Sequence, residues 1–164
     1  FLALVLISLT LGCGSDLNQK ETAVRLQELK AELVLDDKEN IISIDLSERN
    51  ISDDDLPNLT SCKSLKNFYA IYAKFDGSFL ADLAKCDALE LLHLNSCPVT
   101  DEGLKNLFGH SHLSNVDLSG TLVSDRSIAV LKSWPNLTRL EIADAKLSPA
   151  GTQRLHDELP NVEV

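Results

Sequence analysis

Apolar residues recur along this chain with a fixed period. Leu65, Leu89, Leu113 and Leu137 are separated by 24 positions each, and Ile41 lies 24 positions before Leu65. Self-similarity at a period of this length is typical of proteins built from stacked structural units, in which each unit packs on its neighbours. The pattern predicts five equivalent units between residues 41 and 164.

Each unit begins with a predicted strand. The third and fifth positions after the anchor residue are apolar, which is the alternation of a strand with one buried face. These inward positions are Ile44, Phe68, Leu92, Val116 and Leu140, then Leu46, Ala70, Leu94, Leu118 and Ile142.

A short helix is predicted in the second half of each unit. Positions fifteen and eighteen after the anchor form an i, i+3 pair, which lies on one face of a helix. The pairs are Leu56/Leu59, Leu80/Leu83, Leu104/Leu107, Ile128/Leu131 and Thr152/Leu155. Residues suited to a helix N-cap precede them at Ser52, Asp76, Thr100, Ser124 and Ser148.

The repeated consensus is Leu-x-x-Leu-x-Leu-x-x-(Thr/Cys)-x-Val-(Thr/Ser)-Asp-x-x-Leu-x-x-Leu, clearest over 89–107 and 113–131. It resembles the leucine-rich repeat of the cysteine-containing type, over about residues 20 to 164. The phrases at 99–104 and 159–164 are similar to those of short leucine-rich-repeat lipoproteins of planctomycete-like bacteria. Ala70, Ala73 and Arg49 depart from the pattern. The resemblance implies an α/β right-handed solenoid with one parallel sheet on the concave side, short helices on the convex side and an N-terminal cap helix.

Both ends of the stack are expected to be covered. Residues 14–40 are interpreted as a short linker and an amphipathic cap helix over 21–33, with Val24, Leu26, Leu29 and Leu33 on its apolar face. A hairpin over 33–46 then leads into the first unit, and residues 162–164 predict a short final strand after the five units of 41–164.

The first thirteen residues form a predicted export signal. Residues 1–12 contain no charge, and this apolar run is too short to cross a bilayer but suits the h-region of a signal peptide. The sequence at 9–13 resembles the lipobox of bacterial lipoproteins, which implies lipidation of Cys13 and anchoring in the cell envelope, with Gly14 favouring the outer membrane. A plain exported leader and a buried N-terminal strand are the alternatives.

Charge excludes one large class of partners. The chain of 164 residues has a net charge of −10 and a pI near 4.7. Binding of nucleic acid requires a basic surface that displaces counterions from phosphates, so nucleic-acid binding is not expected. The length suits one domain and a single core.

The outward residues of a parallel sheet form rows that cross the strands, because equivalent positions lie about 4.8 Å apart. Exposed aromatic side chains in such rows are typical of binding surfaces, and an acidic flank that includes Asp45 and Glu48 suits a basic or hydrogen-bonding partner. The candidate ligand-binding residues are Tyr69, Ile71, Tyr72, Leu91, His93, Asn95, Asn115, Asp117, Arg139 and Glu141. Contact through the rim or the convex helices is the alternative.

Catalytic and metal chemistry are weakly indicated. A hydrolase would use His93 with Asp117 as its orienting carboxylate and Ser96 or Ser119 as nucleophile, but no glycine-rich oxyanion loop accompanies them. No Cys-x-x-Cys pair occurs and the four histidines are scattered, so neither a metal nor a cofactor is expected.

Three further cysteines follow Cys13. Cys62 and Cys86 occupy equivalent positions in successive units, where either a disulfide or a pair of buried thiols is compatible with the spacing. Cys97 is expected in the core. The chain as a whole is expected to be a monomeric, non-enzymatic protein-binding module held at a membrane, with a self-associating structural component of the envelope as the alternative.

Overall fold

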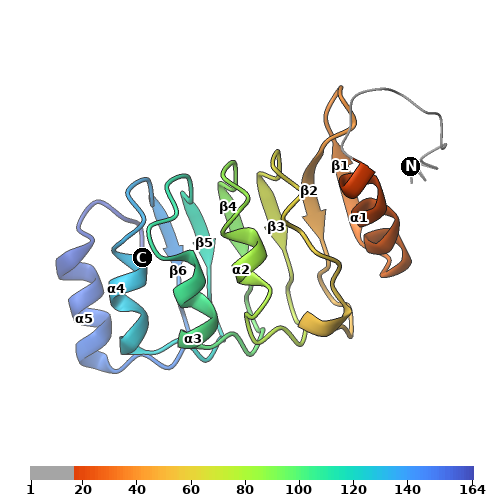
Figure 1. Cartoon of the computed structure of the whole chain (residues 1–164). Coiled ribbons are helices and arrows are strands. Elements are labelled where there is room, and N and C mark those ends of the chain that lie inside the picture. Colours follow the sequence, from red (N-terminus) through yellow and green to blue (C-terminus); the bar gives the residue numbers. More distant parts are fainter. Residues whose placement is uncertain (1–16) are drawn as a thin grey trace, which may run out of the picture.

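The computed structural model describes residues 17–164 and contains one six-stranded sheet with short helices along one side (Figure 1). The strands lie in chain order: β1 (Glu32–Leu35), β2 (Ile41–Asp45), β3 (Asn67–Tyr69), β4 (Leu91–His93), β5 (Asn115–Asp117) and β6 (Arg139–Glu141). The α-helices are α1 (Leu17–Glu28), α2 (Leu80–Leu83), α3 (Asp101–Leu104), α4 (Ile128–Leu131) and α5 (Pro149–Glu158). Short 3-10 helices are η1 (Asp53–Asp55), η2 (Lys105–Leu107) and η3 (Asp125–Ser127). The protein is therefore of the α/β class, as predicted. In the first unit the predicted helix with the Leu56/Leu59 pair is not formed, and only η1 precedes these residues, so that prediction is wrong.

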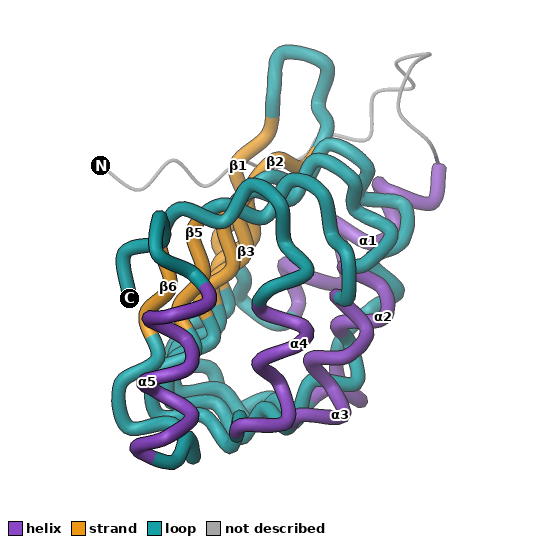
Figure 2. Tube along the Cα trace, turned by 90° about the vertical axis from the view of Figure 1, so that its left-hand side faces the viewer, coloured by secondary structure: helices purple, strands orange, loops and turns teal. Residues whose placement is uncertain are grey.

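The register of the sheet reproduces the 24-residue period. From β2 to β6 the strands are parallel, and Ser43, Asn67, Leu91, Asn115 and Arg139 pair in sequence, each with the residue 24 positions later. The alignment of the five units is thereby confirmed. Helices α2 to α5 lie on one side of the molecule and the strands lie on the opposite side, as the view along the stack shows (Figure 2).

A continuous apolar core lies between the strands and the helices. The anchors Leu65, Leu89 and Leu113 are fully buried, and the inward strand positions from the first to the fourth unit are buried with them. Ile142 is the exception, because no further strand covers the last unit and leaves this side chain half-buried. The prediction of the core positions is confirmed for the other units.

The start of the chain differs from the prediction. α1 ends at Glu28, and a Schellman motif closes it: Lys30 has φ 61°, its N–H donates to the Gln27 carbonyl at 2.9 Å, and the Ala31 N–H donates to that of Leu26 at 3.0 Å. The expected helix over 21–33 is therefore wrong in its bounds.

The buried face of α1 also differs from the expected one. It is formed by Gln19, Thr22, Ala23 and Leu26, whereas Val24 is exposed. Leu33 belongs to β1, which pairs with β2 in the expected antiparallel hairpin.

At the other end, the predicted final strand is reduced to a single bridge. Glu163 pairs with Arg139, its carbonyl accepts from the Leu140 N–H at 2.8 Å, and its N–H donates to the Thr138 carbonyl at 2.9 Å. Among the helices within residues 17–164, none has both the length and the apolar character needed to cross a bilayer.

Candidate functional site

The face of the sheet opposite to the helices, here called the sheet face, presents its outward side chains in rows across the strands. The strand register aligns the residues of the first two rows, and the third row follows them at the carboxyl ends of the strands. The first row is Ser43, Asn67, Leu91, Asn115 and Arg139, the second is Asp45, Tyr69, His93, Asp117 and Glu141, and the third is Ser47, Ile71, Asn95, Ser119 and Ala143. The expected rows are thus present on the strands.

An aromatic centre lies on β3, on β4 and in the turn that follows β3. We define it as Tyr69, Ile71, Tyr72, Leu91 and His93. The rings of Tyr69 and His93 meet edge to face with centroids 5.4 Å apart, and the Nε2 atom of His93 lies 3.4 Å from Oδ1 of Asn115. Tyr72 keeps 66% of its surface exposed, and the other four side chains are half-buried. Clustered aromatic groups at this exposure can bury much area on contact with few rotatable bonds to fix.

A fourth row, which we call the ridge, lies beside the third row as expected from the period, but its backbone conformation was not predicted. Its five residues all have a left-handed backbone, with φ between 57° and 69°, and all are exposed: Glu48, Tyr72, Ser96, Gly120 and Asp144. The conformation lets the ridge N–H groups continue the hydrogen-bond ladder into the next unit, as between Tyr72 and the Asn95 carbonyl at 3.2 Å. Gly120 was the one sequence signal for this left-handed backbone, since glycine and aspartate accept a positive φ readily, whereas tyrosine does not.

The polar residues of the candidate site differ in availability. Asp117 is only 9% exposed, and its Oδ1 atom accepts a hydrogen bond from the Ser119 N–H at 2.8 Å, so it supports the turn after β5. The guanidinium of Arg139 lies 2.9 Å from Glu141 and 3.8 Å from Glu163. The side-chain carbonyl oxygen of Asn95 is buried without a hydrogen-bond partner.

The geometry does not assemble the hydrolase arrangement. His93 and Asp117 are register neighbours on β4 and β5, but the His93 ring contacts Asn115 while the Asp117 carboxylate accepts from Ser119. Within residues 17–164 no hydrogen bond joins His93 to Asp117. An imidazole that is not oriented by a carboxylate lacks the hydrogen bond on which a triad depends.

The described cysteines are buried free thiols. Burial raises the pKa of Cys62 to about 11 and that of Cys86 to about 12, and the Cys86 thiol donates to the Leu59 carbonyl at 3.5 Å. Cys97 donates to the Ala70 carbonyl at 2.6 Å, in the core position expected for it. In the described part of the chain, no group of three potential metal ligands comes together. Cys13 lies outside the described residues.

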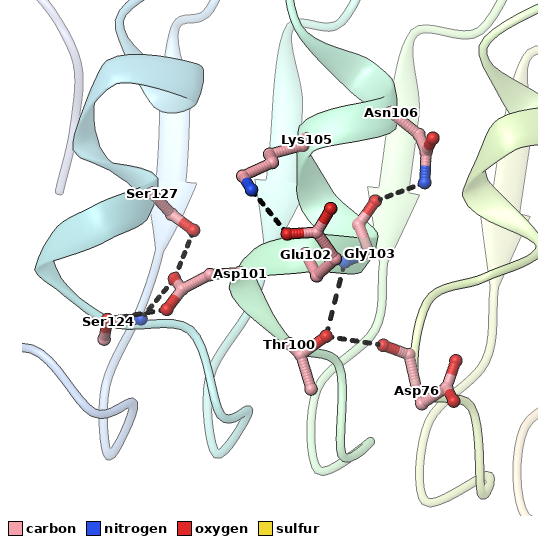
Figure 3. Close-up of polar contacts among 9 residues, drawn as sticks. All are labelled: Asp76, Thr100, Asp101, Glu102, Gly103, Lys105, Asn106, Ser124 and Ser127. Carbon is pink, nitrogen blue, oxygen red and sulfur yellow. Dashed lines mark hydrogen bonds and ion pairs between the residues drawn. The ribbon is translucent and has the colours of Figure 1, made fainter.

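On the helical side, an aspartate of the third unit and an aspartate of the fourth unit each link to the following unit, and Figure 3 shows the first of these links. The Asp101 carboxylate accepts from the Ser124 N–H at 2.9 Å, from the Ser124 hydroxyl at 2.7 Å and from the Ser127 hydroxyl at 2.5 Å. The Asp125 carboxylate accepts from the Ser148 N–H at 2.8 Å and from the Ser148 hydroxyl at 2.6 Å. These hydrogen bonds join neighbouring helix N-termini and hold the units at a fixed spacing.

The second unit lacks this link because Gly77 occupies the aspartate position. There the backbones approach closely instead: a Cβ atom on Gly103 would lie 2.8 Å from the Asp76 carbonyl oxygen and 2.8 Å from the Gly77 Cα. The Thr100 N–H donates to that carbonyl at 3.0 Å. The Thr100 hydroxyl also donates to it at 3.4 Å and accepts from the Gly103 N–H at 3.3 Å (Figure 3). Thr100 and Ser148 are thus confirmed as N-caps, while α2 has Phe79 at its N-cap and the expectation for Asp76 is wrong.

A hollow of about 550 Å³ lies at the last unit, beside β6 and α5. Its lining combines apolar groups such as Leu140, Ile142 and Val164 with the polar groups Thr152 and His156.

Comparison with protein-family models and with curated proteins finds no match to this chain. The assignment of a function therefore rests on the residues and the geometry described above.

Proposed function

We propose that this protein is a recognition module of the leucine-rich-repeat type, folded as a right-handed solenoid, which binds another protein through its sheet face. The 24-residue register from β2 to β6 supports the repeat assignment, since it matches the consensus residue by residue. The buried row of Ala73, Cys97 and Thr121 fits the cysteine-containing type.

The aromatic centre is the observation that carries the proposal. Tyr69 and Tyr72 are the two tyrosines of the chain, and both lie on the sheet face. A surface made of regular strands is already ordered before binding, so that contact does not require the folding of a segment.

The proposal includes a place for the protein. We propose that Cys13 carries the lipid of a bacterial lipoprotein and anchors the module in the cell envelope, with the outer membrane favoured by Gly14. The support is the apolar run that precedes Cys13 and its resemblance to a lipobox. A cysteine in such a motif carries several acyl chains, which bind a membrane more strongly than one.

The test is the capture of envelope proteins by the full chain. Replacing Tyr69 and Tyr72 together by alanine removes the largest contact groups of the aromatic centre, and we expect capture to fall at least tenfold, since a contact residue at the centre of an interface contributes about 2 kcal/mol or more. Chemical cross-linking and mass spectrometry of captured proteins provide the readout.

Phe108→Ala is the matched control. Phe108 is 67% exposed and directly follows η2, away from the sheet face, and its removal is expected to leave capture unchanged. Equal capture by the double tyrosine variant and the native protein would show that partners bind elsewhere, for example on the helices or by self-association.

A further inference from the structure

The sheet face is apolar in its middle and acidic at both ends. The aromatic centre occupies the second and third units, whereas Asp45 and Glu48 lie in the first unit and Glu141 and Asp144 in the fifth. In the four rows, Arg139 is the one side chain with a permanent positive charge, and Glu141 and Glu163 neutralise it.

The exposed residues of the ridge also have carboxylates at both ends of the row. Glu48 and Asp144 stand at its ends, Tyr72 lies next to Glu48, and the small residues Ser96 and Gly120 lie between. Within residues 17–164 neither end carboxylate forms an ion pair. A surface with unpaired carboxylates at both ends favours a cationic partner and repels an acidic one.

We propose, building on the function above, that the partner is a positively charged polypeptide segment that crosses the strands along the ridge. An aromatic or aliphatic side chain of the segment packs on Tyr69 and Tyr72. An arginine or lysine then lies near Glu48 and another near Asp144. The small residues Ser96 and Gly120 leave room for the main chain of the segment between its two cations.

Strand spacing sets the distance between these cations. Neighbouring strands are about 4.8 Å apart, so the first and fifth units are separated by roughly 19 Å, which an extended chain at about 3.3 Å per residue covers in about six residues. The apolar anchor is expected nearer to the cation that faces Glu48. Lys74 and Lys146 lie two residues after the ridge residues Tyr72 and Asp144. Because these lysines repel other cations, the cations of the partner should lie on the side of the ridge that faces the strands.

Selection of a phage-displayed library of random linear peptides on the full chain tests this inference. We expect enriched sequences to carry two arginines or lysines about six residues apart, with an aromatic or leucine side chain between them. A synthetic peptide from the enriched set then serves as the probe in fluorescence anisotropy. Its affinity for the native chain should fall as salt is raised, because exposed charges are screened.

Variants separate the charge from the aromatic contribution. Glu48→Gln with Asp144→Asn should weaken binding of the peptide about fivefold and flatten its salt dependence. Glu102→Gln with Asp157→Asn, which removes the same charge from exposed positions on α3 and α5, should leave the affinity unchanged.

Three results would overturn the inference: enrichment of neutral or acidic peptides, failure to enrich any peptide, or unchanged affinity in the Glu48 and Asp144 variant. If Tyr69→Ala with Tyr72→Ala abolishes peptide binding while the carboxylate variant binds with unchanged affinity, the proposed function stands and only the charge preference is wrong. If the tyrosine variant binds normally, the proposed binding face is wrong as well.

Discussion

At the scale of single residues, Tyr72 shows how position and conformation combine. A bulky side chain at φ 60° is strained by about 1 to 3 kcal/mol, and the glycine at the equivalent position 120 avoids that strain. The main-chain hydrogen bond to Asn95 holds the turn in this conformation. Stability therefore does not account for a tyrosine at this position, whereas contact with a partner would.

His110 is a buried histidine whose surroundings disfavour protonation. It is 8% exposed, its Nε2 atom lies 3.2 Å from the Cys86 carbonyl oxygen, and its Nδ1 atom has no hydrogen-bond partner. Burial is the largest influence and holds the pKa of His110 below its ordinary value. The folded protein thus prefers the neutral imidazole.

This preference predicts a pH dependence of stability. Because the unfolded chain binds the proton more tightly, the free energy of unfolding should fall as pH drops through about 6.5, the ordinary histidine pKa, and should be constant well above it. Urea unfolding at a series of pH values measures this. His110→Gln should remove the dependence in that window, since its amide can still donate to the Cys86 carbonyl but does not titrate.

His112→Gln is the control for this prediction, because His112 is exposed. It should retain the native pH profile. A His110→Gln protein whose stability still falls between about pH 7 and 5.5 would assign the effect to another group.

At the scale of elements, the aspartate links between helix N-termini are the polar counterpart of the apolar core. Partial burial raises the pKa of Asp101, but hydrogen bonds from Ser127 and Ser124 outweigh it and leave the pKa lowered. This carboxylate therefore stabilises the fold above the ordinary aspartate pKa, and its contribution is lost as pH falls below that value.

Asp101→Ala tests the strength of the link. The change removes three hydrogen bonds and leaves the hydroxyl of Ser127, which is buried, without its acceptor. We expect the free energy of unfolding to fall by about 2 to 3 kcal/mol, measured by urea denaturation at pH 7.

The neighbouring Glu102→Ala is the matched control for Asp101→Ala. Glu102 is exposed and pairs with Lys105 at the start of η2 in the same unit, so its loss should change stability by less than about 0.5 kcal/mol. Equal effects of the two substitutions would mean that the link between units contributes little.

The sequence predicted the elements that depend on local pattern. The strands and the core followed from apolar residues at a fixed period, and Thr100 and Ser148 were identified as caps because a capping hydroxyl acts within one turn. The start of α2 was missed, because the segment from Asp76 to Phe79 is held by Asp53 of the previous unit, which accepts from the N–H groups of Asp76 at 2.8 Å and of Phe79 at 3.0 Å.

The candidate site was predicted in outline only. The sheet rows follow from the register, and therefore from the period. The ridge depends on backbone angles that hydrogen bonds between units impose, and the sequence around Tyr72 does not encode them. The low exposure of Asp117 likewise arises from a hydrogen bond to its own turn. These features require the packed structure.

At the scale of the whole molecule, regular stacking produces a long, preformed surface. Core anchors and ladder hydrogen bonds recur with the same period, and aspartates link three of the four junctions between units, so the sheet face is supported along its length. The antiparallel hairpin and α1 cover the first unit. Under the proposed function, this rigidity keeps the aromatic centre in place without an ordering step on binding.

Site-specific photo-cross-linking in cells that produce the protein tests the central claim most directly. A photoreactive phenylalanine analogue in place of Tyr72 should form a discrete adduct with a second protein, and the same analogue at Phe108 should not. The Tyr69→Ala change should reduce the adduct at position 72. Adducts at position 108 with none at position 72 would contradict the claim that the sheet face is the binding surface.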